Sequence, residues 1–485
     1  MWMFLGNTGN QVIGFLLGII LARILAPEDF GMLLTIQVFT GLAGFVAGGG
    51  MGQALVRAKD ATASDYHVVF TLQLGIGLLI YAGFFAVAPS FAQWYERPLY
   101  ETLLRVSALS FVIRPFVNVP NSILHREMRF KEKSLVRLFN LVVSITIAIT
   151  MGILGYGVWS LTISGLVASV ISIFVLCRLA GWLPRIDTGW RRAGELARYG
   201  FLVSVNDIAN YVRQQTCNLI LSRTGAPAAV GLYNKADSLA MLPQNFVAGS
   251  VYEVLFRALS KAQDDLNLSR YLYFRSITLV SVYAFPLFIG VGFLAEPFVV
   301  SLYGEKWRAA ASPISILVLA APFMILENMS GAVIAARGQL GKEFLAQCVT
   351  ILITVLSILA LLDLGLQGVA MGVAAGIAYA SFHLNWIASR SLGTRFADAG
   401  RAFLPGVLLA APMIAGMALL RWLLPAGLRE SEFLYLLTMT AAGALIYATA
   451  FFVAPIPALE GEVERWKKHL ASARRKWPGA QRTTT

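Results

Sequence analysis

One stretch of the chain decides how its fold is interpreted: ILARILAP at residues 20–27. The chain repeats it 200 positions later as ILSRTGAP at 220–227, and Gly31 matches Gly231 in the same register. Six of the eighteen positions are identical between 20–37 and 220–237, where chance would give about one at average composition. The register continues beyond the next apolar segment, because Leu55 and Arg57 match Leu255 and Arg257.

Later segments repeat with small shifts. The triplet Pro115, Phe116 and Asn121 corresponds to Pro322, Phe323 and Asn328, and the glycines at 157 and 165 correspond to those at 368 and 376. We therefore expect spans 1–6 and 7–12 to be two copies of one six-helix unit. Six is an even number, so both copies share one orientation, which is the arrangement of transporters with a central cavity between two bundles.

The composition places the chain in a membrane. Of its 485 residues, 57% are hydrophobic and 13% are charged, and the mean hydropathy is +0.69, whereas soluble domains contain about 25% charged residues. The apolar segments are continuous and about twenty residues long, which predicts an all-α integral membrane protein. We expect about fourteen transmembrane helices, near 2–24, 30–55, 68–92, 103–122, 137–155, 157–178, 199–222, 229–254, 271–296, 310–336, 343–363, 366–389, 402–424 and 432–454.

Lysine and arginine are concentrated in alternate loops. With a cytoplasmic N-terminus, 27 of the 39 lie in inner loops or the C-terminal tail and 8 lie in outer loops. Since positive residues mark the cytoplasmic side, the sequence predicts that both termini are cytoplasmic. The same bias accounts for the net charge of +13, so we do not expect nucleic acid as a partner.

The repeat and the loops predict a division into five parts. These are an N-lobe at 1–180 with spans 1–6, a cytoplasmic linker at 181–198, a C-lobe at 199–390 with spans 7–12, two extra spans at 391–454, and a basic cytoplasmic tail at 455–485. No loop exceeds about twenty residues, which leaves no room for a soluble catalytic domain.

The two ends of the chain carry further signals. The first span begins at Trp2 without a basic leader or cleavage site, so we interpret it as a span and not as a signal peptide. Its missing basic flank predicts further residues upstream. The tail places Leu459, Val463, Trp466, Leu470 and Trp477 at helical spacing beside basic residues, a pattern typical of a helix on the anionic inner leaflet or of a solvated basic tail.

Several short motifs point to a known family. They are LAR at 21–23, PEDFG at 27–31, GQALV at 52–56, REMRFK at 126–131, GYGVW at 155–159, GLY at 231–233 and YGEKW at 303–307. With these motifs the chain, from about residue 5 to 450, resembles the polysaccharide-transporter (Wzx-like) flippases of the multidrug/oligosaccharidyl-lipid/polysaccharide exporter superfamily.

That resemblance implies twelve or fourteen helices in two lobes around a V-shaped cavity, in the inner membrane of a bacterium. The implied activity is translocation of undecaprenyl-pyrophosphate-linked oligosaccharide repeat units from the cytoplasmic to the periplasmic leaflet by alternating access. These units serve exopolysaccharide, capsule or O-antigen synthesis. The implied partners are the lipid-linked oligosaccharide, membrane lipids, and the polymerase and export proteins of the same pathway.

Polar residues inside the predicted spans are the candidate substrate site, because intramembrane ions are costly and tend to be functional. Cations would attract the pyrophosphate, since a guanidinium fork binds phosphate oxygens bidentately, and amides would face the sugar hydroxyls. Arg114, Asn118 and Asn121 share one face of the fourth span. The remaining candidates are Asn7, Asn10 and Gln11 in the first span, Asn210, Arg213 and Gln214 in the seventh, and Lys235 in the eighth.

Each cation also has a structural alternative, namely an internal ion pair such as Lys235 with Asp237 or Arg213 with Asp207. Inward movement of a proton or a sodium ion would supply the energy, and the candidate coupling carboxylates are Asp207, Glu253 and Glu327. For each carboxylate, structural pairing is again the alternative.

Other functional classes fit less well. We expect no catalytic residues, no metal site and no cofactor, because the sequence has no H-E-x-x-H motif, paired-cysteine motif or phosphate-binding loop. A membrane polysaccharide polymerase or glycosyltransferase would need a large outer loop. Exporters of drugs, cations or peptidoglycan precursors in the same superfamily are the closer alternatives, because they share the architecture.

Overall fold

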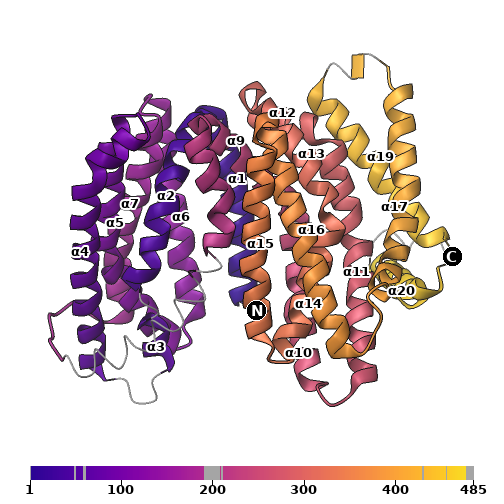
Figure 1. The fold of residues 1–485 in the computed structure, drawn as a ribbon, viewed down its shortest axis with the longest axis horizontal. Helices are drawn as coiled ribbons and strands as arrows, with labels where there is room; N and C mark the ends of the chain where they lie inside the picture. Colours follow the sequence, from indigo (N-terminus) through magenta and orange to yellow (C-terminus); the bar gives the residue numbers. More distant parts are fainter. Residues whose placement is uncertain are drawn as a thin grey trace, which may run out of the picture. The chain divides into compact units, whose positions relative to one another are not determined.

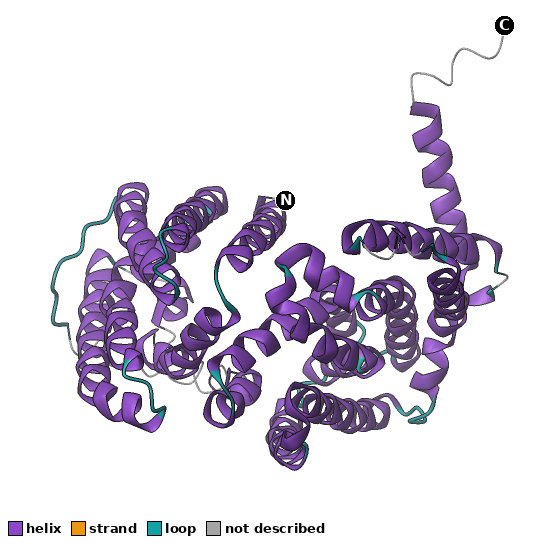
Figure 2. Cartoon of the chain, turned by 90° about the horizontal axis from the view of Figure 1, so that it is seen from above, coloured by secondary structure: helices purple, strands orange, loops and turns teal. Residues whose placement is uncertain are grey.

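The computed structural model describes residues 2–48, 51–57, 62–189, 208, 211–425, 427–428, 431–454 and 456–476. Within these ranges, side chains are described except at 2–12, 53–54, 57, 340, 470 and 473–476. Helices and loops make up all of the described chain, as Figure 2 shows.

The first half of the chain forms seven described helices. They are α1 (Trp2–Ile24), α2 (Pro27–Gly48), α3 (Met51–Arg57), α4 (Ala63–Trp94), α5 (Leu99–Arg126), α6 (Phe130–Ile153) and α7 (Val158–Ala180).

The second half begins with a helix over 211–224. It continues with α9 (Pro227–Ala240), the π-helix η1 (Gln244–Ala248), α10 (Gly249–Lys261), α11 (Leu266–Phe293), α12 (Ala295–Tyr303), the 3₁₀ helix η2 (Glu305–Ala310), α13 (Ala311–Leu319), α14 (Ala321–Ala336), α15 (Leu340–Ala360), η3 (Leu362–Leu364), α16 (Gly365–Leu392), α17 (Asp398–Leu423), α19 (Glu432–Val453), η4 (Pro457–Leu459) and α20 (Glu460–Lys476).

Ten of the described helices are long and apolar enough to span a membrane. The pair Glu305–Leu319 and Ala321–Ala336, bent by 53°, passes the same test as one broken span. Every predicted span contains helix within the described residues, so the all-α membrane architecture is confirmed. A count of fourteen spans is compatible with these helices.

Three spans that we expected to be continuous are broken. The segment 229–254 divides into α9, η1 and α10 around Pro243, which cannot donate a backbone hydrogen bond. The segment 310–336 bends between α13 and α14, where Pro322 stands in the first turn of α14. The segment 30–55 divides into α2, which ends at Gly48, and the short helix α3.

Contacts group the chain into two compact units. The first contains Met1–Asn234 and Leu302–Trp307, and the second contains Lys235–Ser301 and Arg308–Thr485. The boundary crosses α9, so these units differ from the lobes at 1–180 and 199–390. The five-part division into lobes, linker, extra spans and tail remains a prediction.

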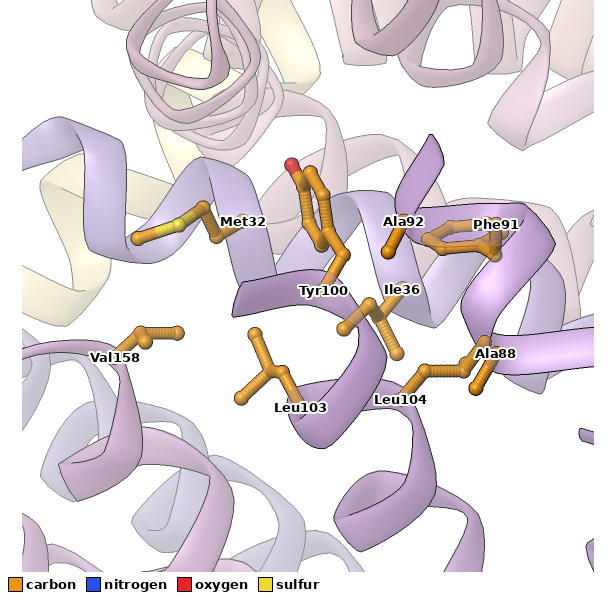
Figure 3. Close-up of a cluster of buried hydrophobic side chains, with 9 residues drawn as sticks. All are labelled: Met32, Ile36, Ala88, Phe91, Ala92, Tyr100, Leu103, Leu104 and Val158. Carbon is orange, nitrogen blue, oxygen red and sulfur yellow. The ribbon is translucent and has the colours of Figure 1, made fainter. Parts of the chain in front are cut away.

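A hydrophobic cluster holds α2, α4, α5 and α7 of the first unit together (Figures 1 and 3). Ile36 of α2 and Ala88 of α4 are fully buried in it, together with Leu103 and Leu104 of α5. Tyr100 lies in the same cluster and is 1% exposed. Because lipid is as apolar as these side chains, close packing and not removal from water provides the attraction between the spans.

Residues Leu302–Trp307 come from the second half of the chain but belong to the first unit. The Trp307 indole is fully buried and donates to the carbonyl of Ala22 at 2.8 Å. Lys306 Nζ donates to the Arg23 carbonyl at 2.9 Å, and Arg23 Nε donates to the Leu302 carbonyl at 2.8 Å. The bonds from Trp307 and Lys306 satisfy carbonyls in the last turn of α1, which have no partner within the helix.

Candidate substrate-binding site

A pocket lined in part by polar side chains lies within the first unit, close to α3 and the turn between α5 and α6. Its volume of about 460 Å³ is within the usual range for ligand sites. The pocket is lined by Gly48, Gly52, Val56, Gln73, Asn118, Asn121, Ser122, His125 and Lys133. Amides, a hydroxyl and two basic side chains therefore meet in one place between apolar helices.

Helix α5 supplies much of the polar wall. Asn118, Asn121 and His125 recur at helical spacing, so they share one face. The Asn121 amide nitrogen donates to the Val117 carbonyl at 3.0 Å. The side-chain amide of Asn118 makes no hydrogen bond within the described part of the chain, which leaves it available to a ligand. The structure thus places Asn118 and Asn121, two residues named from the sequence, in one pocket.

Gln73 of α4 belongs to the pocket but was missed in the sequence. Its side chain is 2% exposed, and its amide nitrogen donates to the Gly48 carbonyl at 3.1 Å. Its Oε1 is buried and has no hydrogen-bond partner among the described residues. A buried acceptor without a partner costs about 1–3 kcal/mol, so a ligand hydroxyl that donated to Oε1 would be favoured. The available signal was that Gln73 is the only amide in the predicted span 68–92.

Basic residues border the pocket near the turn between α5 and α6. Lys133 is half-buried in the pocket wall, and His125 is exposed at its edge. Arg129 is held in place by the Leu179 carbonyl at 2.8 Å and by Glu127 and Glu132, each at 3.3 Å. Lys133 is therefore the cation best placed to meet an anionic group in the pocket.

Arg114 lies one helical turn before Asn118 on α5. Its guanidinium packs on Gly44 of α2, where an added Cβ would be 2.2 Å from a guanidinium nitrogen, and lies 5.2 Å from the centre of the Phe111 ring. No carboxylate among the described residues forms an ion pair with Arg114. Tyr211 packs against α2, the helix of Gly44, because its hydroxyl donates to the Gln37 carbonyl at 2.6 Å.

Three other predicted substrate residues with described side chains are not part of the pocket wall. Arg213 is half-buried and Gln214 is exposed on the helix over 211–224, and Lys235 lies on α9 in the second unit. Asn7, Asn10 and Gln11 lie on α1, but their side chains are outside the described residues, as is Asn210 altogether.

The candidate coupling carboxylates occupy different environments. Glu253 is 71% exposed and pairs with Arg257, one helical turn later, at 3.3 Å. Glu327 is half-buried on α14. Asp207 is outside the described residues. Within the described chain, no group of three or more His, Cys, Asp or Glu side chains could hold a metal ion.

Comparison with solved structures identifies the fold. The chain is similar to the lipid II flippase MurJ in an inward closed conformation, with a TM-score of 0.75 and 17% identity over 93% of this chain and 98% of that one. It is also similar to an inward-facing multidrug resistance MATE family transporter of the MOP superfamily, with a TM-score of 0.61 and 16% identity over 80% and 96% of the two chains.

Sequence comparison identifies the family. The chain is 28% identical to the succinoglycan biosynthesis transport protein ExoT of Rhizobium meliloti (strain 1021), over 66% of this chain and 64% of that relative. It is 21% identical to the lipopolysaccharide biosynthesis protein WzxC of Escherichia coli (strain K12), over 67% and 66% of the two chains. The match thus spans slightly less than two thirds of each relative's length. The profile of the family described as polysaccharide biosynthesis protein matches residues 20–312. Because this match covers more than half of the chain, the protein belongs to the polysaccharide biosynthesis protein family.

Proposed function

We propose that this protein is a flippase that moves undecaprenyl-pyrophosphate-linked oligosaccharide repeat units from the cytoplasmic to the periplasmic leaflet. Family membership carries the proposal, since ExoT is a transport protein for succinoglycan biosynthesis and WzxC acts in lipopolysaccharide biosynthesis. The fold supports it, because the similar MurJ structure is that of a lipid II flippase. The product is used for exopolysaccharide, capsule or O-antigen synthesis.

The pocket of the first unit is the proposed sugar-binding part of the site. Gln73, Asn118 and Asn121 offer amide donors and acceptors, which suit the hydroxyls of a saccharide. Lys133 lies in the same wall and would meet a phosphate oxygen as a point charge. Arg114 lies one turn earlier on α5 and would contact the pyrophosphate as the substrate moves.

We propose a supporting role for the predicted residues outside this pocket. Arg213, Gln214 and Lys235 would contact the substrate in another stage of the cycle, together with Asn7, Asn10, Gln11 and Asn210. The two sequence repeats would expose the substrate to each side of the membrane in turn.

Inward movement of a proton or sodium ion would drive this cycle. Asp207, Glu253 and Glu327 are the proposed coupling carboxylates, and the exposed ion pair with Arg257 suits a structural role for Glu253.

The proposed location is the bacterial inner membrane, with both termini in the cytoplasm. In this orientation the turn between α5 and α6 faces the cytoplasm, so the pocket lies on the side from which the substrate enters. The polymerase and export proteins of the same pathway are the proposed partners.

The deciding experiment is mass spectrometry of lipid-linked oligosaccharides in a deletion strain, with surface polysaccharide measured in parallel. Complete repeat units should accumulate while surface polymer is lost, and the wild-type gene should reverse both effects. Truncated oligosaccharides would instead indicate a missing sugar-transfer step and an enzyme. An unchanged lipid profile would favour a drug or another lipid as the substrate.

A further inference from the structure

The last described helix, α20, lies across the membrane-spanning helices of the second unit. Helix α20 follows α19 after the short helix η4. In Figure 1 it is seen along its axis beside the upright helices α11 and α17, and in Figure 2 it is seen from the side while the spans are seen end-on. A helix that lies across the spans runs along the membrane plane.

Contacts to α11 fix this direction. Arg275 pairs with Glu462 at 3.0 Å and donates to the Ala458 carbonyl at 2.5 Å. The Trp466 indole donates to the Tyr283 hydroxyl at 3.0 Å. Leu459 is 1% exposed and, with Val463, belongs to a cluster containing residues of α11, α17 and α19. The first two turns of α20 are thus docked on the second unit by charge, hydrogen bonding and apolar packing.

Charge is divided sharply along α20. Its acidic residues, Glu460, Glu462 and Glu464, lie in the first two turns, and no Asp or Glu follows in the sequence. Glu462 is used internally by Arg275 and also pairs with Arg465 at 3.0 Å. Basic residues dominate afterwards, as Arg465, Lys467, Lys468, Arg474, Arg475 and Lys476.

The middle of α20 combines these charges with an aromatic side chain. Lys467 and Lys468 are exposed, and Trp466 is 45% exposed beside them although it is anchored to Tyr283. In sequence, Val463, Trp466 and Leu470 recur at helical spacing. A tryptophan at the boundary between apolar and basic residues is typical of helices in the membrane interface.

We propose that α20 is a docking surface for the anionic phospholipid headgroups of the inner leaflet. The apolar side of α20 packs on the second unit, the exposed part of Trp466 meets the acyl boundary, and the lysines contact headgroup phosphates. The docking of the first two turns on α11 holds Lys467 and Lys468 beside the second unit, so both bind headgroups there. The assignment of α20 to the inner leaflet rests on the proposed cytoplasmic location of the termini. Lipid binding by α20 does not depend on flippase activity.

Lipid titration of the purified full-length protein tests this inference. Native mass spectrometry in detergent would compare phosphatidylglycerol with the zwitterionic lipid phosphatidylcholine. We expect Lys467→Glu with Lys468→Glu to weaken phosphatidylglycerol binding by roughly tenfold or more, as expected for two basic residues near a charged surface. Phosphatidylcholine binding should stay unchanged, and high salt should reduce the difference between the two lipids.

The matched control reverses two other exposed charges, Arg257→Glu with Lys261→Glu on α10. It produces the same change in net charge and should retain at least half of the wild-type affinity. Equal losses in both double variants would show a general charge effect and overturn the proposal. Phosphatidylglycerol binding by the α20 variant with wild-type affinity would also overturn the proposal. So would a variant that loses a co-purified protein but keeps its lipid, because α20 would then bind a protein partner. Variants are compared only when their size-exclusion profiles match that of the wild-type protein. The lipid titration does not use the transport substrate, so a negative result would leave the flippase proposal intact.

Discussion

Gly31 of α2 and Gly231 of α9 make a reciprocal contact within the first unit. A Cβ added to Gly31 would lie 1.7 Å from the carbonyl oxygen of Pro227, and a Cβ added to Gly231 would lie 2.0 Å from the carbonyl oxygen of Pro27. The two glycines and two prolines are the same positions of the sequence repeat. The repeat therefore has a physical role here, because only residues without a side chain allow the two helices to approach so closely.

Alanine at either glycine should destabilise the protein. A methyl group at Gly31 or Gly231 would collide with backbone and not with a movable side chain, and overpacking of this kind typically costs about 1–3 kcal/mol. We expect Gly31→Ala and Gly231→Ala to lower the thermal midpoint of the purified protein, as measured by differential scanning fluorimetry in detergent. Gly165→Ala is the control, since an added Cβ meets no atom within 4 Å; an equal shift in that variant would argue against the contact.

Loss of the Gln73 amide should impair transport. Gln73→Leu keeps the approximate volume but removes the Oε1 acceptor in the pocket and the bond to Gly48. We expect reduced surface polysaccharide and accumulated lipid-linked repeat units at normal protein level in the membrane. Gln93→Leu on the same helix, outside the pocket wall, is the control. Normal export by Gln73→Leu would exclude this pocket from the substrate path.

A lysine at position 114 should not support the transport function of Arg114. A guanidinium binds phosphate bidentately whereas an ammonium cannot, and hydrogen bonds to charged groups contribute about 1.5–3 kcal/mol. Arg114→Ala and Arg114→Lys should therefore both reduce polymer export by about tenfold or more in a complementation assay. Full activity of the alanine variant at equal protein level would leave Arg114 without a role in binding.

The two described coupling carboxylates should respond differently to neutralisation. Glu253 is exposed in a surface ion pair, and such pairs contribute about 0–1 kcal/mol, so Glu253→Gln should leave export within about twofold of wild type. Glu327→Gln should slow export and reduce its dependence on the ion gradient, as measured with and without an uncoupler. The reverse ranking would reassign coupling to Glu253.

Trp307 should be more important for stability than other tryptophans. Trp307→Phe removes the donor to the Ala22 carbonyl from a fully buried position, and an unpaired buried acceptor costs about 1–3 kcal/mol. The thermal midpoint should fall, whereas Trp422→Phe, at a position that is 78% exposed, should change it little. Similar midpoints for both variants would contradict the importance of the Ala22 bond.

Helix content could be predicted from the sequence because length and apolar composition determine which segments can cross a bilayer. The interruptions at Pro243 and at Ala320 were harder to predict, since a proline in a span is compatible with a kink, a π-turn or a continuous helix. Local composition does not select among them, because packing against neighbouring helices satisfies the freed backbone groups.

The candidate site was predicted only in part. Asn118 and Asn121 could be identified because they share a face of one helix, and periodicity reveals such faces. Gln73 and Lys133 come from two other helices, and nothing in one sequence indicates that α4 and α6 approach α5 at those levels. The helical pattern places residues on a face, whereas tertiary packing decides which faces enclose a pocket.

The placement of Leu302–Trp307 also limits how this protein can be divided or recombined. Six residues encoded after position 300 complete the first unit, so a gene fragment that ends earlier would specify that unit without its Trp307 anchor. Chimeras between relatives should therefore inherit the end of α1 and residues 302–307 from the same parent. The sequence repeat suggests two modules that could be exchanged independently. Because residues 302–307 belong to the first unit, replacing one half of the chain alone would separate that unit from part of itself.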